Sequence, residues 1–175
     1  MFSRLKKDNR GVSLMEIMVV VAILAVVTGV GVMSYNTMSG KPAQQCAQQL
    51  TYSLERHRTS TMGKVRAKYV LYKDDVSGKI IAAEYFSNDP DPDKWNEPTL
   101  IEVGSKGVDI TYISGGTMYS LGTGVANGLT LEFSRETGSF KQQPDGTYCT
   151  KISAKRAGRV HDVTLVPLTG KVYID

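Results

Sequence analysis

Cysteine and histidine are scarce in this sequence of 175 residues, which contains two of each. His57 and His161 stand far apart, and no Cys-x-x-Cys pair occurs. Because zinc sites need such residues at close spacing, the sequence predicts no metal centre. Both histidines are expected at the surface or in a structural role.

Catalytic motifs are lacking as well. The sequence contains no Gly-x-Ser-x-Gly, no phosphate-binding loop and no set of serine, histidine and aspartate that its order connects. Carboxylates gather at Asp74-Asp75 and at Asp89, Asp91 and Asp93, but the glycine and glutamate spacing of a calcium loop is missing, which favours solvated turns. We therefore expect a protein that is not an enzyme and needs no cofactor.

Charged residues are absent from position 17 to position 33. This apolar run reaches the lower limit of about 17 residues for a helix that spans a membrane. Basic residues beside a first membrane segment stay on the cytoplasmic side, so we expect one span with the C-terminal part outside the cytoplasm. The leader before the run has a net charge of +3, set by Asp8 against four basic residues: Arg4, Lys6, Lys7 and Arg10.

The candidate processing residue, Gly11, precedes the apolar run instead of following it. In a secretory signal the small residues for cleavage follow the apolar segment, and that segment is discarded. A cut after Gly11 would remove the basic leader and keep the apolar helix on a mature chain of 164 residues, Val12 to Asp175. One carboxylate, Glu16, would then stand at the start of that helix.

This N-terminus resembles that of type IV prepilins and type II secretion pseudopilins over roughly residues 4–36. The matching residues are Gly11, Val12, Ser13, Leu14, Met15 and Glu16, followed by the apolar helix. The family's usual residues differ at Val12, where phenylalanine is common, and at Met15, where isoleucine or valine is. The resemblance implies that a prepilin peptidase cuts between Gly11 and Val12 and that Val12 is N-methylated.

The resemblance also implies a role for Glu16 in assembly. A carboxylate next to hydrocarbon needs a partner, and the resemblance supplies the α-amino group created at Val12, on a neighbouring subunit or on its own chain. The alternative places Glu16 in the lipid headgroup region. The implied partners are other pilins in a helical filament, the prepilin peptidase, an inner-membrane assembly platform and, before assembly, membrane lipid. The implied location is the cytoplasmic (inner) membrane and then a cell-surface or periplasmic filament.

The chain divides into four predicted segments. Pro42 should kink or briefly break the helix, and beyond it Ala43, Ala47, Leu50 and Leu54 recur at helical spacing up to a stop at Gly63. The segments are a leader at 1–11, an apolar helix at 12–36, an amphipathic helix at 37–63 and a β-rich head at 64–175. This order predicts an α+β fold, with a long N-terminal helix packed on an antiparallel β-sheet or β-sandwich.

Short alternating runs predict the strands of the head. The turn at 74–78 indicates a hairpin, and the glycine-rich segment 115–128 indicates a loop or a weakly specified edge. The predicted strands are 67–73, 79–87, 100–103, 108–113, 129–134, 148–154, 160–166 and 171–174.

The last third of the chain resembles the GspH/FimT group of minor pilins and minor pseudopilins. The resemblance rests on a strand ending in glycine at 129–138 and on the terminal strand, Thr-Gly, basic residue, strand pattern at 163–174. It implies an N-terminal helix packed on two β-sheets and a minor position in the filament.

Two further features leave alternatives open. Cys46 and Cys149 either form a disulfide, which a location outside the cytoplasm permits, or are two separate buried thiols. Four basic residues surround a turn at 157–158 and are either a solvated turn or a DNA contact. They are Lys151, Lys155, Arg156 and Arg159.

Together these features predict a minor pilin or pseudopilin, a structural subunit of a type IV pilus or a type II secretion-like filament. The alternative is a DNA-binding minor pilin at the pilus tip that acts in DNA uptake. The net charge of +4 does not favour nucleic acid, because the leader holds +3 of it and the mature chain about +1.

Overall fold

The structure is a computed structural model that describes residues 13–62, 65–89, 91 and 94–175, without the side chains of 29–39. The chain divides into two compact units, Met1–Met38 and Ser39–Asp175. Each unit is described by itself, and the second is called the head.

Two helices follow one another along the chain, α1 (Leu14–Ser39) and α2 (Lys41–Thr61), with Gly40 between them. The sequence predicts a break at Pro42, and the structure has it two residues earlier, with Pro42 in the first turn of α2. A proline ring fixes φ and removes an N–H, which costs little in a first turn where that N–H has no helical partner. Pro42 therefore helps to start α2.

One face of α2 is buried in the head and the other is exposed. On the exposed face, the side chain of Tyr52 is 69% accessible. The buried residues are three or four positions apart and include all four that the periodicity assigns to the apolar stripe. They are Ala43, Cys46, Ala47, Leu50, Ser53, Leu54, His57 and Thr61.

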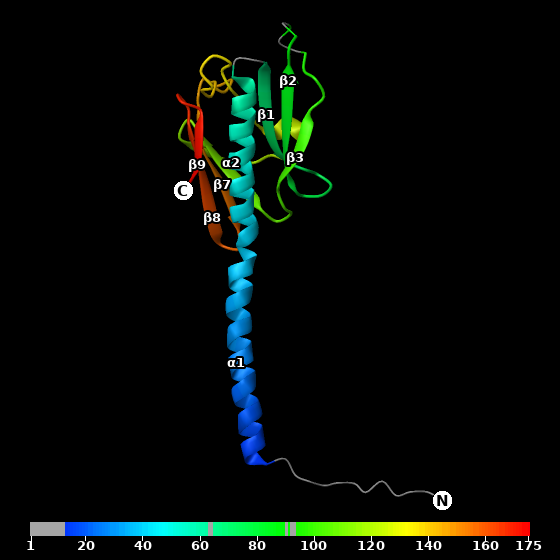
Figure 1. The fold of residues 1–175 in the computed structure, drawn as a ribbon, viewed down its shortest axis with the longest axis vertical. Helices are drawn as coiled ribbons and strands as arrows, with labels where there is room; N and C mark the ends of the chain where they lie inside the picture. The colour runs from blue at the N-terminus through cyan, green and yellow to red at the C-terminus, as the bar shows by residue number, and fades with distance from the viewer. Residues whose placement is uncertain (1–12, 63–64, 90, 92–93) are drawn as a thin grey trace, which may run out of the picture. The chain divides into compact units, whose positions relative to one another are not determined.

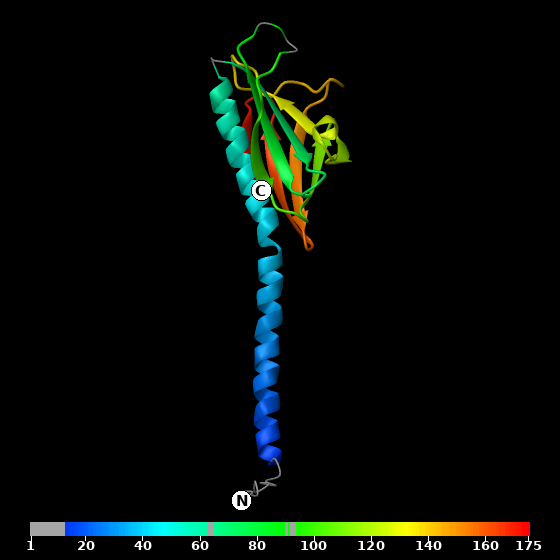
Figure 2. The same cartoon turned by 90° about the vertical axis from the view of Figure 1, so that its right-hand side faces the viewer.

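Strands of the described part of the head form two sheets (Figures 1 and 2). The first has the order β3-β2-β1-β6 and the second the order β5-β4-β7-β8-β9, with every neighbouring pair antiparallel. The first sheet comprises β1 (Arg66–Lys73), β2 (Ile80–Ser87), β3 (Thr99–Gly104) and β6 (Leu129–Glu132). The second comprises β4 (Asp109–Ser114), β5 (Thr117–Ser120), β7 (Cys149–Arg156), β8 (Arg159–Val166) and β9 (Lys171–Ile174).

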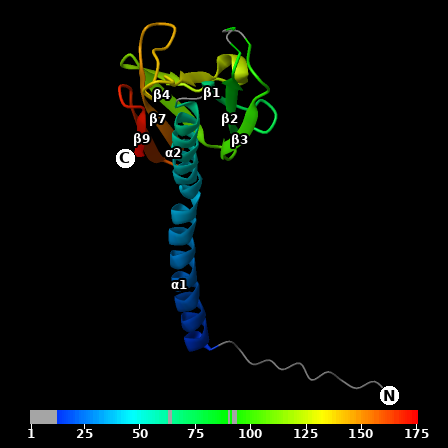
Figure 3. The same ribbon diagram turned by 45° about the horizontal axis from the view of Figure 1, so that its top comes forward.

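The core of the head lies where α2 meets both sheets. Figure 3 shows α2 with β1, β2 and β3 on one side and β4, β7 and β9 on the other. The helix contacts β1 and β3 of the first sheet and β7, β8 and β9 of the second. Alternate strand residues such as Leu71, Ile152 and Leu165 are at most 2% exposed and pack in one cluster with Leu50 and Leu54. The head is therefore α+β with two antiparallel sheets, as the sequence predicts.

The glycine-rich segment contributes an edge strand. β5 pairs with β4 at the edge of the second sheet, and all four of its residues are exposed. Gly115 and Gly116 close the turn between the two strands with φ of +57° and +83°, values that glycine adopts without steric strain. A short 3-10 helix, η1 (Val125–Asn127), then leads to β6.

Asp74 closes the predicted hairpin between β1 and β2. Its Oδ2 accepts hydrogen bonds from the Ser77 backbone N–H at 2.8 Å and from the Ser77 hydroxyl at 2.6 Å. These two bonds hold the pKa of Asp74 below its ordinary value. The carboxylate therefore has a structural role within the turn.

Candidate processing and assembly site

Ser13 caps the start of α1. Its hydroxyl oxygen accepts a hydrogen bond from the Met15 backbone N–H at 3.2 Å, and its carbonyl accepts one from the Glu16 N–H at 3.0 Å. Ser13 is thus the N-cap, and Glu16 is the third residue of the helix. Sequence reasoning missed this role of Ser13, although Ser-x-x-Glu is the spacing of a capping box and could have revealed it.

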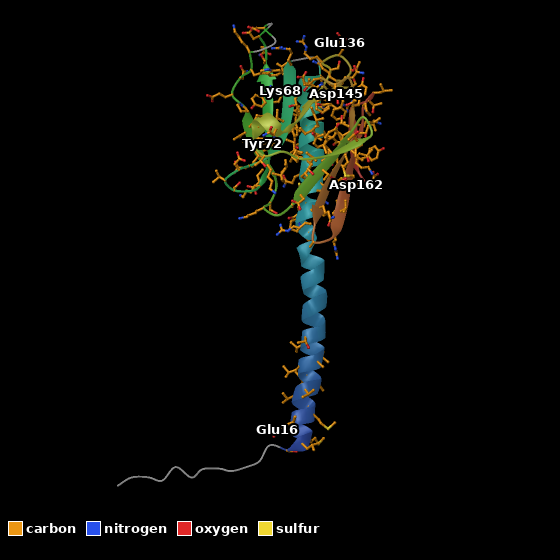
Figure 4. The ribbon with its side chains drawn as sticks, turned by 180° about the vertical axis from the view of Figure 1, so that it is seen from behind. Glu16, Lys68, Tyr72, Glu136, Asp145 and Asp162 are labelled. Atoms are coloured by element: carbon orange, nitrogen blue, oxygen red, sulfur yellow. The ribbon has the colours of Figure 1, made fainter. Side chains whose placement is uncertain are left out.

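Glu16 is an exposed carboxylate in the first turn of α1, where Figure 4 labels it. The positive end of a helix dipole lies at this turn and stabilises a negative charge by about 0.3 to 1 kcal/mol. Within the residues that the structure describes, Glu16 has no ion-pair partner. Gly11 and Val12, the predicted cleavage and methylation residues, lie outside the described part. The carboxylate is therefore open to a cation supplied from elsewhere.

Beyond Glu16, the described surface of α1 is apolar on every side. Eleven large apolar side chains from Leu14 to Val27, nine of them after Glu16, are each at least 50% exposed. Thr28, the one polar side chain after Glu16 among the described side chains of α1, donates hydrogen bonds back to the Leu24 and Ala25 carbonyls. Among the described residues, no helix combines the length and the hydropathy required to cross a membrane. A helix that is apolar all round is normally covered by lipid or by other protein.

In the head, the two glycines of the GspH/FimT resemblance meet. Gly138 and Gly170 both have φ of +66°. A Cβ atom on Gly170 would lie 1.7 Å from the Gly138 carbonyl oxygen, and Arg58 Nε of α2 donates to the same oxygen at 3.0 Å. The turn after β6 and the turn between β8 and β9 are thus joined to each other and to the helix.

Cys46 and Cys149 are free thiols that lie in the same buried core. Burial raises the pKa of each thiol to about 12, which makes both unreactive at neutral pH. The disulfide is not formed in this structure, which has the alternative arrangement of two separate buried thiols.

The position of β7 explains why the two thiols are apart. Cys46 Sγ is 2.7 Å from where a Cβ on Gly104 would lie, at the end of β3. The turn after Gly104 contacts Arg156, the last residue of β7, whereas Cys149 is the first. The seven residue steps along β7, at about 3.3 Å each, put its two ends roughly 23 Å apart. A disulfide needs its two Cα atoms within about 7 Å, so this arrangement does not bring Cys46 and Cys149 close enough to be joined.

The four basic residues considered for DNA contact do not lie on one face of the second sheet. Lys151 Nζ pairs with Asp162 Oδ2 at 2.9 Å on the outer face of the second sheet, where Figure 4 labels Asp162. Lys155 shares that face because side chains alternate along β7, while Arg156 and Arg159 are paired across the hairpin on the other face. The group is therefore divided between two faces, and one member is already neutralised.

Lys94 neutralises the carboxylates of the proline-rich loop. Its Nζ lies 3.8 Å from Oδ2 of both Asp89 and Asp91, and Asp89 Oδ1 accepts the Asp91 N–H at 2.9 Å. Asp93 lies outside the described residues. In the part that the structure describes, no three His, Cys, Asp or Glu residues are grouped so that they could hold a metal ion.

A buried polar cluster joins α2 to β2. Glu84 is 2% exposed and its Oε2 is 2.6 Å from Arg56 Nη2, while its Oε1 is 3.9 Å from Nδ1 of the fully buried His57. The His57 ring packs against Phe86 and Tyr69. Burial, and then the charge of Arg56, lower the pKa of His57 to about 4. His57 is thus a neutral core residue at physiological pH, which fits the predicted structural role.

A match to the prokaryotic N-terminal methylation motif covers residues 6–32. Comparison with curated proteins and with solved structures gives no match. The motif is of the prepilin type, so it indicates a pilin-type or pseudopilin subunit that a prepilin peptidase processes and that assembles with other pilins. It indicates a structural protein rather than an enzyme, one that is membrane-anchored before it enters a filament.

Proposed function

We propose that the chain is a minor pilin or pseudopilin, a structural subunit of a type IV pilus or a type II secretion-like filament. Prepilin peptidase cuts between Gly11 and Val12, and Val12 is then N-methylated. The observation that carries the proposal is α1, a helix that is apolar all round after one exposed carboxylate. Such a helix needs its apolar surface to be covered. Membrane lipid covers it before assembly, and the helices of neighbouring subunits cover it in the filament core.

Burial of α1 supplies the energy of assembly. Each of its eleven half-exposed apolar side chains contributes about 1 kcal/mol when the rest of its surface leaves water, so the total is on the order of 10 kcal/mol. Residues 17–33 first lie in the inner membrane, with the head outside the cytoplasm. In the filament the same surfaces pack against helices of neighbouring subunits.

Glu16 sets the axial register of the subunit. An uncompensated carboxylate among apolar helices is costly, and the free amine of a neighbour's Val12 removes that cost when the two groups meet. The helix dipole lowers the cost of keeping Glu16 charged but neutralises it only in part. Among possible offsets between neighbouring helices, those that bring carboxylate and amine together are therefore favoured.

The test replaces Glu16 by glutamine, because glutamine has nearly the same size and shape and loses only the charge. We expect Glu16→Gln to be processed and inserted like the wild type but to be missing from sheared filaments. Intact mass, resistance to alkaline extraction and immunoblotting of the filament fraction measure the three steps. Ser13→Ala is the matched control, since it weakens the cap, keeps the charge and should still assemble. Efficient incorporation of Glu16→Gln would refute the assigned role.

Processing is tested at Gly11. Gly11→Phe should leave the leader attached, because the peptidase of this family cuts after a glycine, and the chain should then keep its initiator residue and its four basic leader residues. Mass spectrometry of the membrane fraction distinguishes the two products. A mature N-terminus at Val12 in this variant would show that Gly11 is not the processing determinant.

The head supports a minor position of the GspH/FimT type. That resemblance implies a helix on two β-sheets, and it rests on the two glycine turns that lie against each other at Gly138 and Gly170. The alternative role in DNA uptake has less support, because Lys151 is paired with Asp162 and the remaining basic residues of that group lie on two faces.

A further inference from the structure

One end of the head gathers five cations, only three of which belong to the group that the sequence indicated. This end comprises the start of α2, the turn between β3 and β4, and the hairpin between β7 and β8. We call it the basic end, and its cations are Lys41, Lys106, Lys155, Arg156 and Arg159.

Direct contacts hold the three segments together. Arg156 Nη1 donates to the Ser105 hydroxyl at 3.1 Å and to the Lys106 carbonyl at 3.0 Å, which ties the hairpin to the β3–β4 turn. The Arg159 side chain lies over Gly40, where an added Cβ would meet its Cδ at 2.2 Å. Pro42 and Ser105 line one hollow of about 300 Å³, so the start of α2 adjoins the same turn.

The five cations have no ion-pair partner within the described residues. In contrast, Lys73, Lys79, Lys94, Lys141 and Lys151 of the head each lie within 4 Å of a carboxylate. Two acids on neighbouring strands pair with other cations: Glu102 pairs with Lys79, and Asp109, the cross-strand neighbour of Lys155, pairs with Lys73. All five except the half-buried Arg156 are exposed. The basic end therefore presents uncompensated positive charge to the solvent.

Chain connectivity places this end close to the apolar segment. Lys41 follows Met33, the last residue of the charge-free run, by eight residues. Residues 33–39 are helical, at about 1.5 Å per residue, and the two residues that follow add at most about 7 Å, so the chain itself keeps Lys41 within roughly 16 Å of Met33. This upper limit is less than about two Debye lengths at physiological salt, where one is about 8 to 10 Å. A membrane surface at the end of the apolar segment is thus within electrostatic reach of the basic end.

We propose that the basic end binds anionic phospholipid headgroups on the outer surface of the membrane and so holds the head against the bilayer before assembly. This inference rests on the proposed function, because it requires residues 17–33 to lie in lipid. The contacts are with phosphate oxygens and are indifferent to acyl chains, as expected for lysine and arginine side chains at a charged surface. Entry into the filament then breaks them.

The experiment measures the distance of the head from lipid in the full chain. A fluorophore is placed on Val160→Cys, an exposed position on the hairpin of the basic end, or on Leu168→Cys, an exposed position beyond the far end of β8. The native thiols are buried and do not compete for the label. The chain is reconstituted into vesicles of phosphatidylcholine with or without phosphatidylglycerol, and energy transfer to a headgroup acceptor is recorded at about 0.01 M and about 1 M salt.

We expect energy transfer from position 160 to rise with phosphatidylglycerol at low salt and to return to the phosphatidylcholine value at high salt. Each cation near an anionic surface contributes about fivefold to the ratio of lipid-bound to free heads. The double variant Arg156→Gln, Arg159→Gln should lower that ratio by roughly 30-fold, and so should Lys41→Gln, Lys106→Gln, which leaves the Arg156 hydrogen bonds in place. Lys171→Gln, an exposed cation at the far end of the head, is the matched control and should change nothing.

Three results would overturn the inference. The first is energy transfer from position 160 that does not depend on lipid charge or salt, in a chain that resists alkaline extraction. In that case the proposed membrane insertion stands and only the inference about the basic end fails. The second is duplex DNA binding that is equally tight in both vesicles, since the basic end would then be free for DNA. The third is a chain that alkaline extraction removes, which refutes insertion and the inference together.

Discussion

Gly170 has both a conformational and a steric reason to be glycine. Its φ of +66° costs another L residue about 1 to 2 kcal/mol, and a Cβ would overlap the Gly138 carbonyl oxygen. Gly170→Ala should therefore lower the free energy of unfolding by more than about 3 kcal/mol. Gly146→Ala is the matched control, because its φ is +79° and nothing lies within 4 Å, so it should cost about 1 kcal/mol. Urea unfolding compares the two, and equal losses would contradict the contact.

His57 makes the stability of the head depend on pH. Its ordinary pKa is 6.5 and burial lowers it to about 4, so between these values the unfolded chain binds a proton that the folded head rejects. The free energy of unfolding should therefore decrease as pH falls from about 6.5 to about 4, by a total on the order of 3 kcal/mol. Above pH 6.5 the effect is absent. Urea midpoints measured across this interval give the slope.

Two comparisons isolate the histidine. His57→Phe, whose ring can occupy the site beside Phe86 and Tyr69, should remove most of the slope, while His161→Gln should leave it unchanged. The lowered pKa values of Asp74, Asp145 and Asp162 act at lower pH, because those carboxylates lose their stabilising contribution only below their ordinary value of 3.8. A slope that persists in His57→Phe would place its origin in another group.

At the scale of elements, residues close in the sequence were sufficient to predict the helices and the hairpin, whereas the pairing of segments far apart in the sequence could not be predicted. The helical period at Ala43 to Leu54 and the hairpin at 74–78 depend on residues close in sequence, and the structure has both. The start of α2 at Lys41 and the cap at Ser13 were also readable from proline and capping chemistry.

What the sequence could not reveal depends on which strands become neighbours. Lys151 and Asp162 are eleven residues apart and pair only because β7 and β8 form a hairpin in one register. Cys46 and Cys149 belong to one core cluster, but Cys46 lies beside Gly104, whose following turn contacts the last residue of β7, whereas Cys149 is the first residue of that strand. The basic end joins Lys41 and Lys106 to the hairpin by the same kind of long-range contact. Spacing along the chain contains no information about the pairings that join segments far apart in the sequence, such as Lys41 and Lys106 with the hairpin.

At the scale of the whole molecule, apolar surface is divided unequally between the two units. The described core of the head consists of residues from Ala43 onward, all of which belong to the second unit. The described part of α1, in contrast, buries none of its large apolar side chains. The described part of α1 thus presents apolar surface that partners can cover, whereas the described core of the head is already buried.

A chain that begins at Ser39 should therefore fold as a soluble monomer, and its thiols provide the test. Cys46 and Cys149 are 1% and 3% exposed, with pKa values raised to about 12, so neither should react with a thiol reagent in the folded head at pH 8. Both should react at the rate of global unfolding, and Leu54→Ala, which leaves a core cavity costing about 2 to 5 kcal/mol, should accelerate that reaction. Tyr52→Ala on the exposed face of the same helix should not. Fast reaction of the wild-type thiols in the folded head would show that the head needs α1 to close its core. If no reactive thiol appears even after unfolding, the two cysteines are joined in a disulfide.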